Sequence, residues 1–124
     1  MKPRILVVDD EPAVSLFTST VLGRPNCDVE TANSAEKAVQ QLNRTAFDLV
    51  VTNYRMPGES GEATVVAAPG RRPSNPVIIM TGWIHDLPPS QRIGPSAGRI
   101  LAKPFTISDL CRAVSDTRAA VTPS

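Results

Sequence analysis

The sequence predicts a doubly wound α/β domain, in which a parallel sheet carries helices on both faces. Short runs of apolar residues recur along the chain, and helix-like segments separate them. Continuous apolar runs fit strands that are buried on both sides. Parallel strands need crossover connections, which are usually helical and right-handed. We therefore expect one five-stranded parallel sheet.

The first strand and helix are predicted over residues 4 to 23. Residues 5–8 form a continuous apolar run that two acids follow, so the first strand is expected from about Arg4 to Val8. Pro12 suits the first position of a helix, and Gly23 is placed to end it. The apolar residues at helical spacing, or beside those positions, are Val14, Leu16, Phe17, Val21 and Leu22.

Two further strands are predicted on either side of a second helix. Residues 28–31 form a short strand candidate, and Ser34 can cap the helix that follows. The apolar face of that helix contains Ala35, Ala38, Val39 and Leu42. The run at 47–52 is the predicted third strand.

The second half of the chain is rich in proline, so its helices are expected to be short or broken. Proline makes up 12 of the 124 residues, and six of them lie between 69 and 95. Met56-Pro57-Gly58 indicates a turn, and residues 62–68 allow only a two-turn helix. A further short helix is predicted near 90–93.

The last two strands and the final helix complete the pattern. Residues 77–80 form the fourth strand and 99–102 the fifth, which ends at Lys103-Pro104. The final helix has Ser108 near its start as a cap. Its apolar residues are Ile107, Leu110, Cys111 and Val114. The expected strand order is 2-1-3-4-5, the flavodoxin-like arrangement, in a domain of residues 1–120 with a frayed tail at 121–124.

Composition excludes several classes of function. Thirteen basic and twelve acidic residues give a net charge of +1, which argues against binding nucleic acid through bulk charge. There is neither a membrane-length apolar run nor a signal-peptide core, so we expect a soluble, cytoplasmic protein. Cys27 and Cys111 form no CxxC pair, and the chain has no GxGxxG or P-loop sequence for a flavin or nucleotide.

Polar residues follow four of the predicted strands. Carboxyl ends of parallel strands share one edge of the sheet, where ligands of such folds bind. The residues at that edge are Asp9, Asp10, Glu11, Asn53, Thr81 and Lys103. Clustered carboxylates favour Mg²⁺, while a hydroxyl and an ammonium can hold phosphoryl oxygens. The pattern predicts a site that binds a phosphoryl group next to a metal ion.

These motifs resemble those of a known family. The run Val7 to Pro12, the run Phe47 to Gly58 with Gly61, the pair Thr81-Gly82 and the triplet Lys103-Pro104-Phe105 cover nearly the whole chain. Together they resemble the CheY-like receiver domains of response regulators in bacterial two-component systems. The resemblance implies a signalling module rather than an enzyme, with a histidine kinase, phosphotransfer or output protein as partner. We expect no membrane partner and no small-molecule substrate, and binding of nucleic acid is not favoured.

The resemblance also implies roles for individual residues. Asp10 would bind Mg²⁺ directly, together with the backbone carbonyl of Arg55, and Asp9 would help through water. Thr81 and Lys103 would contact the phosphoryl oxygens. The peptide bond before Pro104 would be cis.

Two positions depart from the family pattern. Asn53 stands where receivers have the phosphorylated aspartate. A neutral carboxamide can offer one oxygen to a metal but is a poor nucleophile, so it should not form the acyl phosphate. Its lack of charge should also weaken Mg²⁺ binding. At the switch position, where receivers usually have an aromatic residue, this chain has Ile100.

Several interpretations of Asn53 remain open. It belongs to a natural phosphorylation-independent receiver, or it replaces an original aspartate by engineering, or it deamidates to the acid, which the bulky Tyr54 disfavours. The first gives a pseudo-receiver that acts by protein–protein interaction, and the second an ordinary phosphoaccepting receiver. A Mg²⁺-dependent phosphatase is a further alternative, but the acidic run has no DxD pair.

Overall fold

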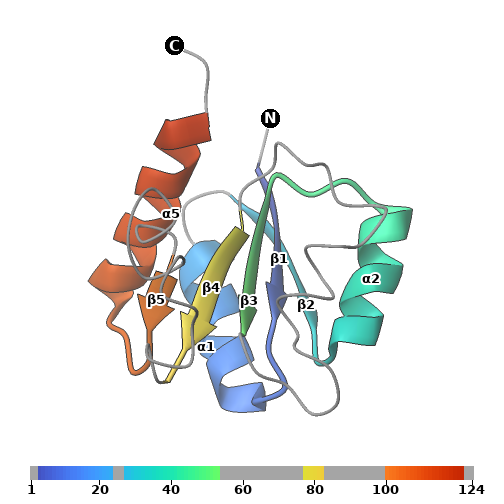
Figure 1. The fold of residues 1–124 in the computed structure, drawn as a ribbon, viewed down its shortest axis with the longest axis horizontal. Coiled ribbons are helices and arrows are strands. Elements are labelled where there is room, and N and C mark those ends of the chain that lie inside the picture. The colour runs from blue at the N-terminus through green and yellow to red at the C-terminus, as the bar shows by residue number, and fades with distance from the viewer. Residues whose placement is uncertain (1–2, 24–26, 54–76, 83–99, 122–124) are drawn as a thin grey trace, which may run out of the picture.

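The structure is a computed structural model, which describes residues 3–23, 27–53, 77–82 and 100–121. Its five strands form one parallel sheet in the order β2-β1-β3-β4-β5 (Figure 1), which confirms the predicted fold class. The strands are β1 (Arg4–Val8), β2 (Asp28–Ala32), β3 (Leu49–Asn53), β4 (Val77–Thr81) and β5 (Ile100–Ala102).

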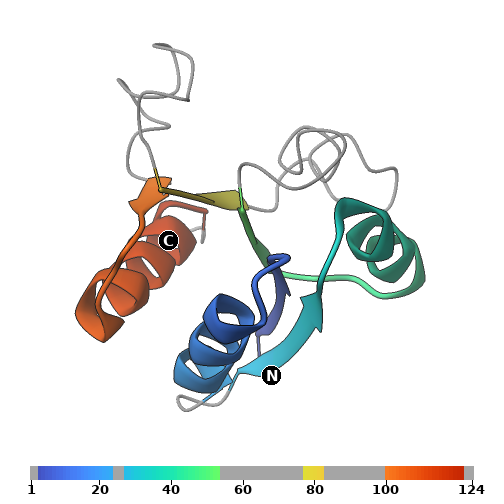
Figure 2. The same ribbon diagram turned by 90° about the horizontal axis from the view of Figure 1, so that it is seen from below.

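The helices cover both faces of the sheet. Helices α1 (Pro12–Gly23) and α5 (Ile107–Val121) lie on one face, and α2 (Ala35–Arg44) lies on the other (Figure 2). Alternate residues of β1 belong to two separate cores, because successive side chains of a strand point to opposite faces. Ile5 and Val7 pack on the side of α1 and α5, and Leu6 and Val8 on the side of α2.

The strand register brings the carboxyl ends of the inner strands to one edge. Val8, the last residue of β1, pairs with Ala32 of β2 and Thr52 of β3. Thr81, the last residue of β4, pairs with Ala102 of β5. Residues that follow these strands are therefore held at the same edge by the sheet itself.

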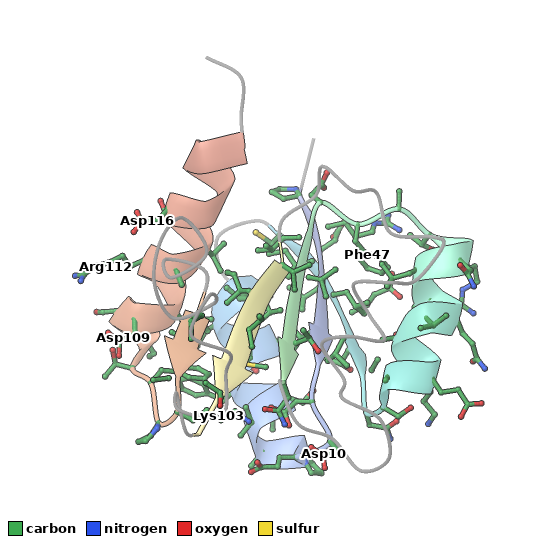
Figure 3. The ribbon with its side chains drawn as sticks, in the orientation of Figure 1. Asp10, Phe47, Lys103, Asp109, Arg112 and Asp116 are labelled. Carbon is green, nitrogen blue, oxygen red and sulfur yellow. The ribbon has the colours of Figure 1, made fainter. Side chains whose placement is uncertain are left out.

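The third strand begins at Leu49, so its predicted start at residue 47 is wrong. The backbone N–H of Asp48 donates to the Arg4 carbonyl at 2.7 Å, and the Arg4 N–H donates to the Asp48 carboxylate at 2.8 Å. These hydrogen bonds hold Asp48, the residue just before β3, against the start of β1. Phe47 precedes them and packs between the sheet and α2 (Figure 3).

The cap of α5 is Thr106, so the prediction that Ser108 caps this helix is wrong. The Thr106 hydroxyl accepts from the Asp109 N–H, and the Asp109 carboxylate accepts from the Thr106 N–H, both at 3.0 Å. This reciprocal pair is a capping box. The backbone and side-chain hydrogen bonds from Thr106 hold the pKa of Asp109 below its usual value.

Helix α1 differs from its predicted apolar face. Leu16 and Phe17 are 69% and 38% exposed, whereas Thr18 is fully buried. Val21 and Leu22 do enter the core, as expected. The helix contains apolar residues around much of its circumference, so the sequence alone does not fix its buried side.

The remaining predicted features lie outside the described residues. They are Arg55, the turn at 56–58, the helices at 62–68 and 90–93, and Arg99. Of the predicted tail at 121–124, residues 122–124 are also outside them, and Val121 is the last residue of α5 rather than part of a tail. Of the helices that the structure describes, none is long and apolar enough to cross a membrane.

Candidate functional site at the carboxyl edge of the sheet

Four of the predicted site residues lie at the carboxyl edge of the sheet. Asp9 and Lys103 directly follow β1 and β5, and Asn53 and Thr81 end β3 and β4. Asp9, Asn53 and Thr81 are 1%, 8% and 3% exposed. The backbone ladder continues to this edge, because the Asp9 N–H donates to Ala32 at 3.0 Å and the Lys103 N–H to Thr81 at 2.7 Å.

Asp9 is the most enclosed charged group among the described residues of the site. Its side chain is 0% exposed, and both of its carboxylate oxygens have partners. Oδ1 accepts from the backbone N–H of Glu11 at 2.9 Å, and Oδ2 accepts from Nζ of Lys103 at 2.9 Å. Such charge-assisted hydrogen bonds are stronger than neutral ones, so they hold both side chains in place.

Lys103 joins two acids of the loop that follows β1. Besides the contact with Asp9, its Nζ lies 3.7 Å from Oε1 of Glu11. The Lys103 side chain is 15% exposed and that of Glu11 62% exposed, so the second pair is the weaker one. The peptide bond between Lys103 and Pro104 is cis, the isomer that the family resemblance implies.

Asp10 stands apart from this ion pair. It lies between β1 and α1 and is exposed to solvent (Figure 3). Its position contrasts with that of Asp9, which points into the protein. The two neighbouring acids therefore have different environments, because successive side chains at the end of a strand point in opposite directions.

Asn53 and Thr81 are the neutral members of the site. The amide of Asn53 has both an acceptor and a donor, and the hydroxyl of Thr81 can also do either. The Thr52 hydroxyl donates to the backbone carbonyl of Asn53 at 3.2 Å, which helps fix the end of β3. Ile100 is half-buried at the start of β5, where it pairs with Ile79.

An apolar cavity of about 540 Å³ adjoins the site between α1 and the loop after β5. The rings of Phe17 and Phe105 lie in it with their centroids 5.9 Å apart. Its lining residues are Glu11, Ala13, Val14, Phe17, Gly82, Lys103, Pro104 and Phe105. The sequence predicts Phe17 only as one of the apolar residues at helical spacing, and it does not predict this cavity; the available signal was that Leu16 and Phe17 add apolar residues beyond one face of the helix.

The fold and this edge define the protein as a doubly wound α/β domain with a polar site beyond the carboxyl ends of its strands. Comparison with known protein families shows which family of such domains the chain belongs to. The family described as "response regulator receiver domain" matches residues 5–115. The chain belongs to this family, whose members are signalling modules of two-component systems.

Relatives with curated descriptions agree with this assignment. The response regulator protein PilR of Pseudomonas aeruginosa is 31% identical over 109 residues, which are 88% of this chain and 24% of PilR. The CpxR homolog of Haemophilus influenzae, a transcriptional regulatory protein, is 32% identical over 123 residues, which are 98% of this chain and 53% of that protein. The chain thus spans about a quarter to a half of the length of these two relatives.

Solved structures show the same fold. A response regulator receiver protein from Sinorhizobium medicae has a TM-score of 0.80 at 27% identity, with 98% of each chain covered. A CheY-like receiver domain protein from Methanospirillum hungatei has a TM-score of 0.81 at 22% identity, with 97% of this chain and 96% of that one covered.

Receiver domains typically bind Mg²⁺ at the acceptor site, and this ion takes oxygen ligands, usually with one or two carboxylates among them. Both oxygens of Asp9 already have partners, and Asn53 is uncharged. Within residues 3–23, 27–53, 77–82 and 100–121, no three His, Cys, Asp or Glu side chains are grouped so as to hold a metal. In this arrangement the described residues do not fit Mg²⁺ as a resident ion.

Proposed function

We propose that this chain is a phosphorylation-independent receiver, a pseudo-receiver of a two-component phosphorelay system. The observation that carries the proposal is Asn53, a neutral residue that is 8% exposed at the end of β3. By resemblance to the family, this is the position of the phosphorylated aspartate. The domain then signals by binding a protein partner rather than by carrying a phosphoryl group.

The chemistry of the amide supports this proposal. In an ordinary receiver a carboxylate oxygen forms a bond to phosphorus while the bond from phosphorus to the donor breaks. The amide of Asn53 has no negative charge to drive this attack. Thr81 and Lys103 lie at the same edge, and by resemblance to the family they would contact phosphoryl oxygens. The proposed site therefore retains contacts for a phosphoryl group but lacks the group that accepts it.

The proposed partners are a histidine kinase, a phosphotransfer protein or an output protein. The cavity between α1 and the loop after β5 supports binding of a protein, because Phe17 lines it with partly exposed apolar surface. Charged groups of Glu11 and Lys103 at its lining would give polar contacts around an apolar centre.

The proposal is tested by intact-mass analysis after incubation with a small phosphoryl donor and Mg²⁺. The wild type should gain no phosphate, whereas Asn53→Asp should gain about 80 Da that hydroxylamine removes, as expected of an acyl phosphate. Because Asn53→Asp supplies the nucleophile and changes few atoms, it also serves as the positive control for the donor. Phosphorylation of the wild type at Asn53 would refute the proposal.

An ordinary receiver in which Asn53 replaces a native aspartate is the second candidate. It is favoured by the retained geometry of Asp9, Thr81 and Lys103 around the same edge. The mass of the protein purified from its native source distinguishes the two. An aspartate at position 53 in that material would establish the ordinary receiver.

A further inference from the structure

The ion pair between Lys103 and Asp9 crosses the site from β5 to β1. Its two side chains are 15% and 0% exposed, and Nζ lies 2.9 Å from Oδ2. The partners are 94 residues apart in the sequence, so only the fold brings them together. A carboxylate this enclosed needs a compensating charge, since an unpaired buried charge is strongly unfavourable.

Among the described residues, Lys103 is the cation that supplies this compensation. Its ammonium contacts Asp9 and lies 3.7 Å from Glu11, and Asn53 adds no charge at the end of β3. With a third acid at position 53, one ammonium would have to be shared among more carboxylates. The neutral amide removes that competitor, so the ammonium can remain with Asp9.

We propose that Lys103 is the resident cation of this site. Its ammonium neutralises the acids after β1 in place of a divalent metal ion, so Mg²⁺ binds tightly only when the Lys103–Asp9 pair is broken. This inference rests on the proposed function, because it takes Asn53 as the native residue of a pseudo-receiver. It explains why the described residues do not fit Mg²⁺ as a resident ion.

The test is calorimetric titration of Mg²⁺ into the wild type and Lys103→Met, a variant that keeps the length of the side chain and removes its charge. We expect the Kd for Mg²⁺ to fall at least about tenfold, because the charge of Asp9 is then available to the metal. The matched control is Lys37→Met. It makes the same change in net charge at an exposed position on α2 that takes no part in the Lys103–Asp9 pair, and should alter the Kd less than about twofold.

A second measurement uses the wild type, so it does not depend on the folding of a variant. The ion pair should give the Lys103 ammonium a slowly exchanging proton signal in ¹H–¹⁵N spectra. Addition of Mg²⁺ should remove this signal over the same concentrations at which calorimetry shows binding. Saturation with Mg²⁺ while the signal stays unchanged would overturn the proposal.

Two results of the calorimetric titration would overturn the proposal. Equal tightening in Lys103→Met and Lys37→Met would show only a long-range effect of net charge, and would overturn the proposal. Failure of Lys103→Met to bind Mg²⁺ more tightly than the wild type would do the same. Phosphorylation of the wild-type protein instead refutes the proposed function, and it is read by mass rather than by metal affinity, so the two failures are distinguishable.

Discussion

Replacement of Thr18 by valine is expected to stabilise the protein, whereas the same replacement at Thr52 is expected to destabilise it. Both threonines are 0% exposed. Among the described residues, the Thr18 hydroxyl has no hydrogen-bond partner, while that of Thr52 donates to the carbonyl of Asn53 at 3.2 Å. Valine keeps the branched shape and exchanges the hydroxyl for a methyl group, so the comparison isolates the hydrogen bond.

The magnitudes follow from burial. An unpaired hydroxyl in a protein interior costs roughly 1–3 kcal/mol, and threonine and valine have similar helix propensities. We therefore expect Thr18→Val to raise the free energy of unfolding by about 1 kcal/mol or more. At Thr52 the variant loses a hydrogen bond with a net contribution of about 1 kcal/mol, partly offset by the added methyl group.

The assay is equilibrium unfolding in urea, with the midpoint and the slope fitted for all three proteins. A difference of about 2 kcal/mol between the variants corresponds to roughly 1 M in the urea midpoint for a domain of this size. The slope should stay constant, since neither change alters the surface exposed on unfolding. A Thr18→Val midpoint at or below that of the wild type would refute the reasoning.

Two further predictions concern the start of α5. Thr106→Ala removes the hydroxyl that accepts from the Asp109 N–H, and it should lower the free energy of unfolding in urea by about 1 kcal/mol. Asp109→Asn should remove a pH-dependent contribution to stability. Because the folded state lowers the pKa of Asp109, the carboxylate stabilises the protein above its unfolded pKa, and this stabilisation is lost as the pH falls through the lowered value. Thermal unfolding from pH 7 to pH 2 should thus show the wild type more stable than Asp109→Asn at neutral pH, and the gap closing in acid. A gap that persists unchanged in acid would contradict this account.

The sheet could be predicted from the sequence because its inner strands are buried on both sides. The runs at Ile5–Val8, Leu49–Val51 and Val77–Met80 contain no polar residues, a pattern that few other structures produce. The positions at the strand ends then locate the site edge. The helix faces were harder to predict, since α1 has apolar residues on its exposed side and a threonine on its buried side.

The contacts within the site could not be predicted in the same way. The sequence places Asp9 and Lys103 at one edge, and the family resemblance implies roles in binding metal and phosphate. It does not indicate that the ammonium pairs with Asp9, because this depends on side-chain reach across the sheet and on which neighbours are charged. The cap at Thr106 was missed because Ser108 is an equally good capping residue by type, and only the backbone geometry distinguishes them.

Backbone hydrogen bonds from Asp9 to Ala32 and from Lys103 to Thr81 hold the main chain of the site in place. The position of the main chain therefore does not depend on which side chains the site carries. Main-chain groups position these residues, so a mutation that changes a side chain at the edge leaves the frame that presents it in place. One substitution in such a domain can therefore abolish phosphotransfer while the protein still folds and keeps its binding surface. Receivers that no longer accept phosphate are, in this view, an accessible evolutionary product of the architecture.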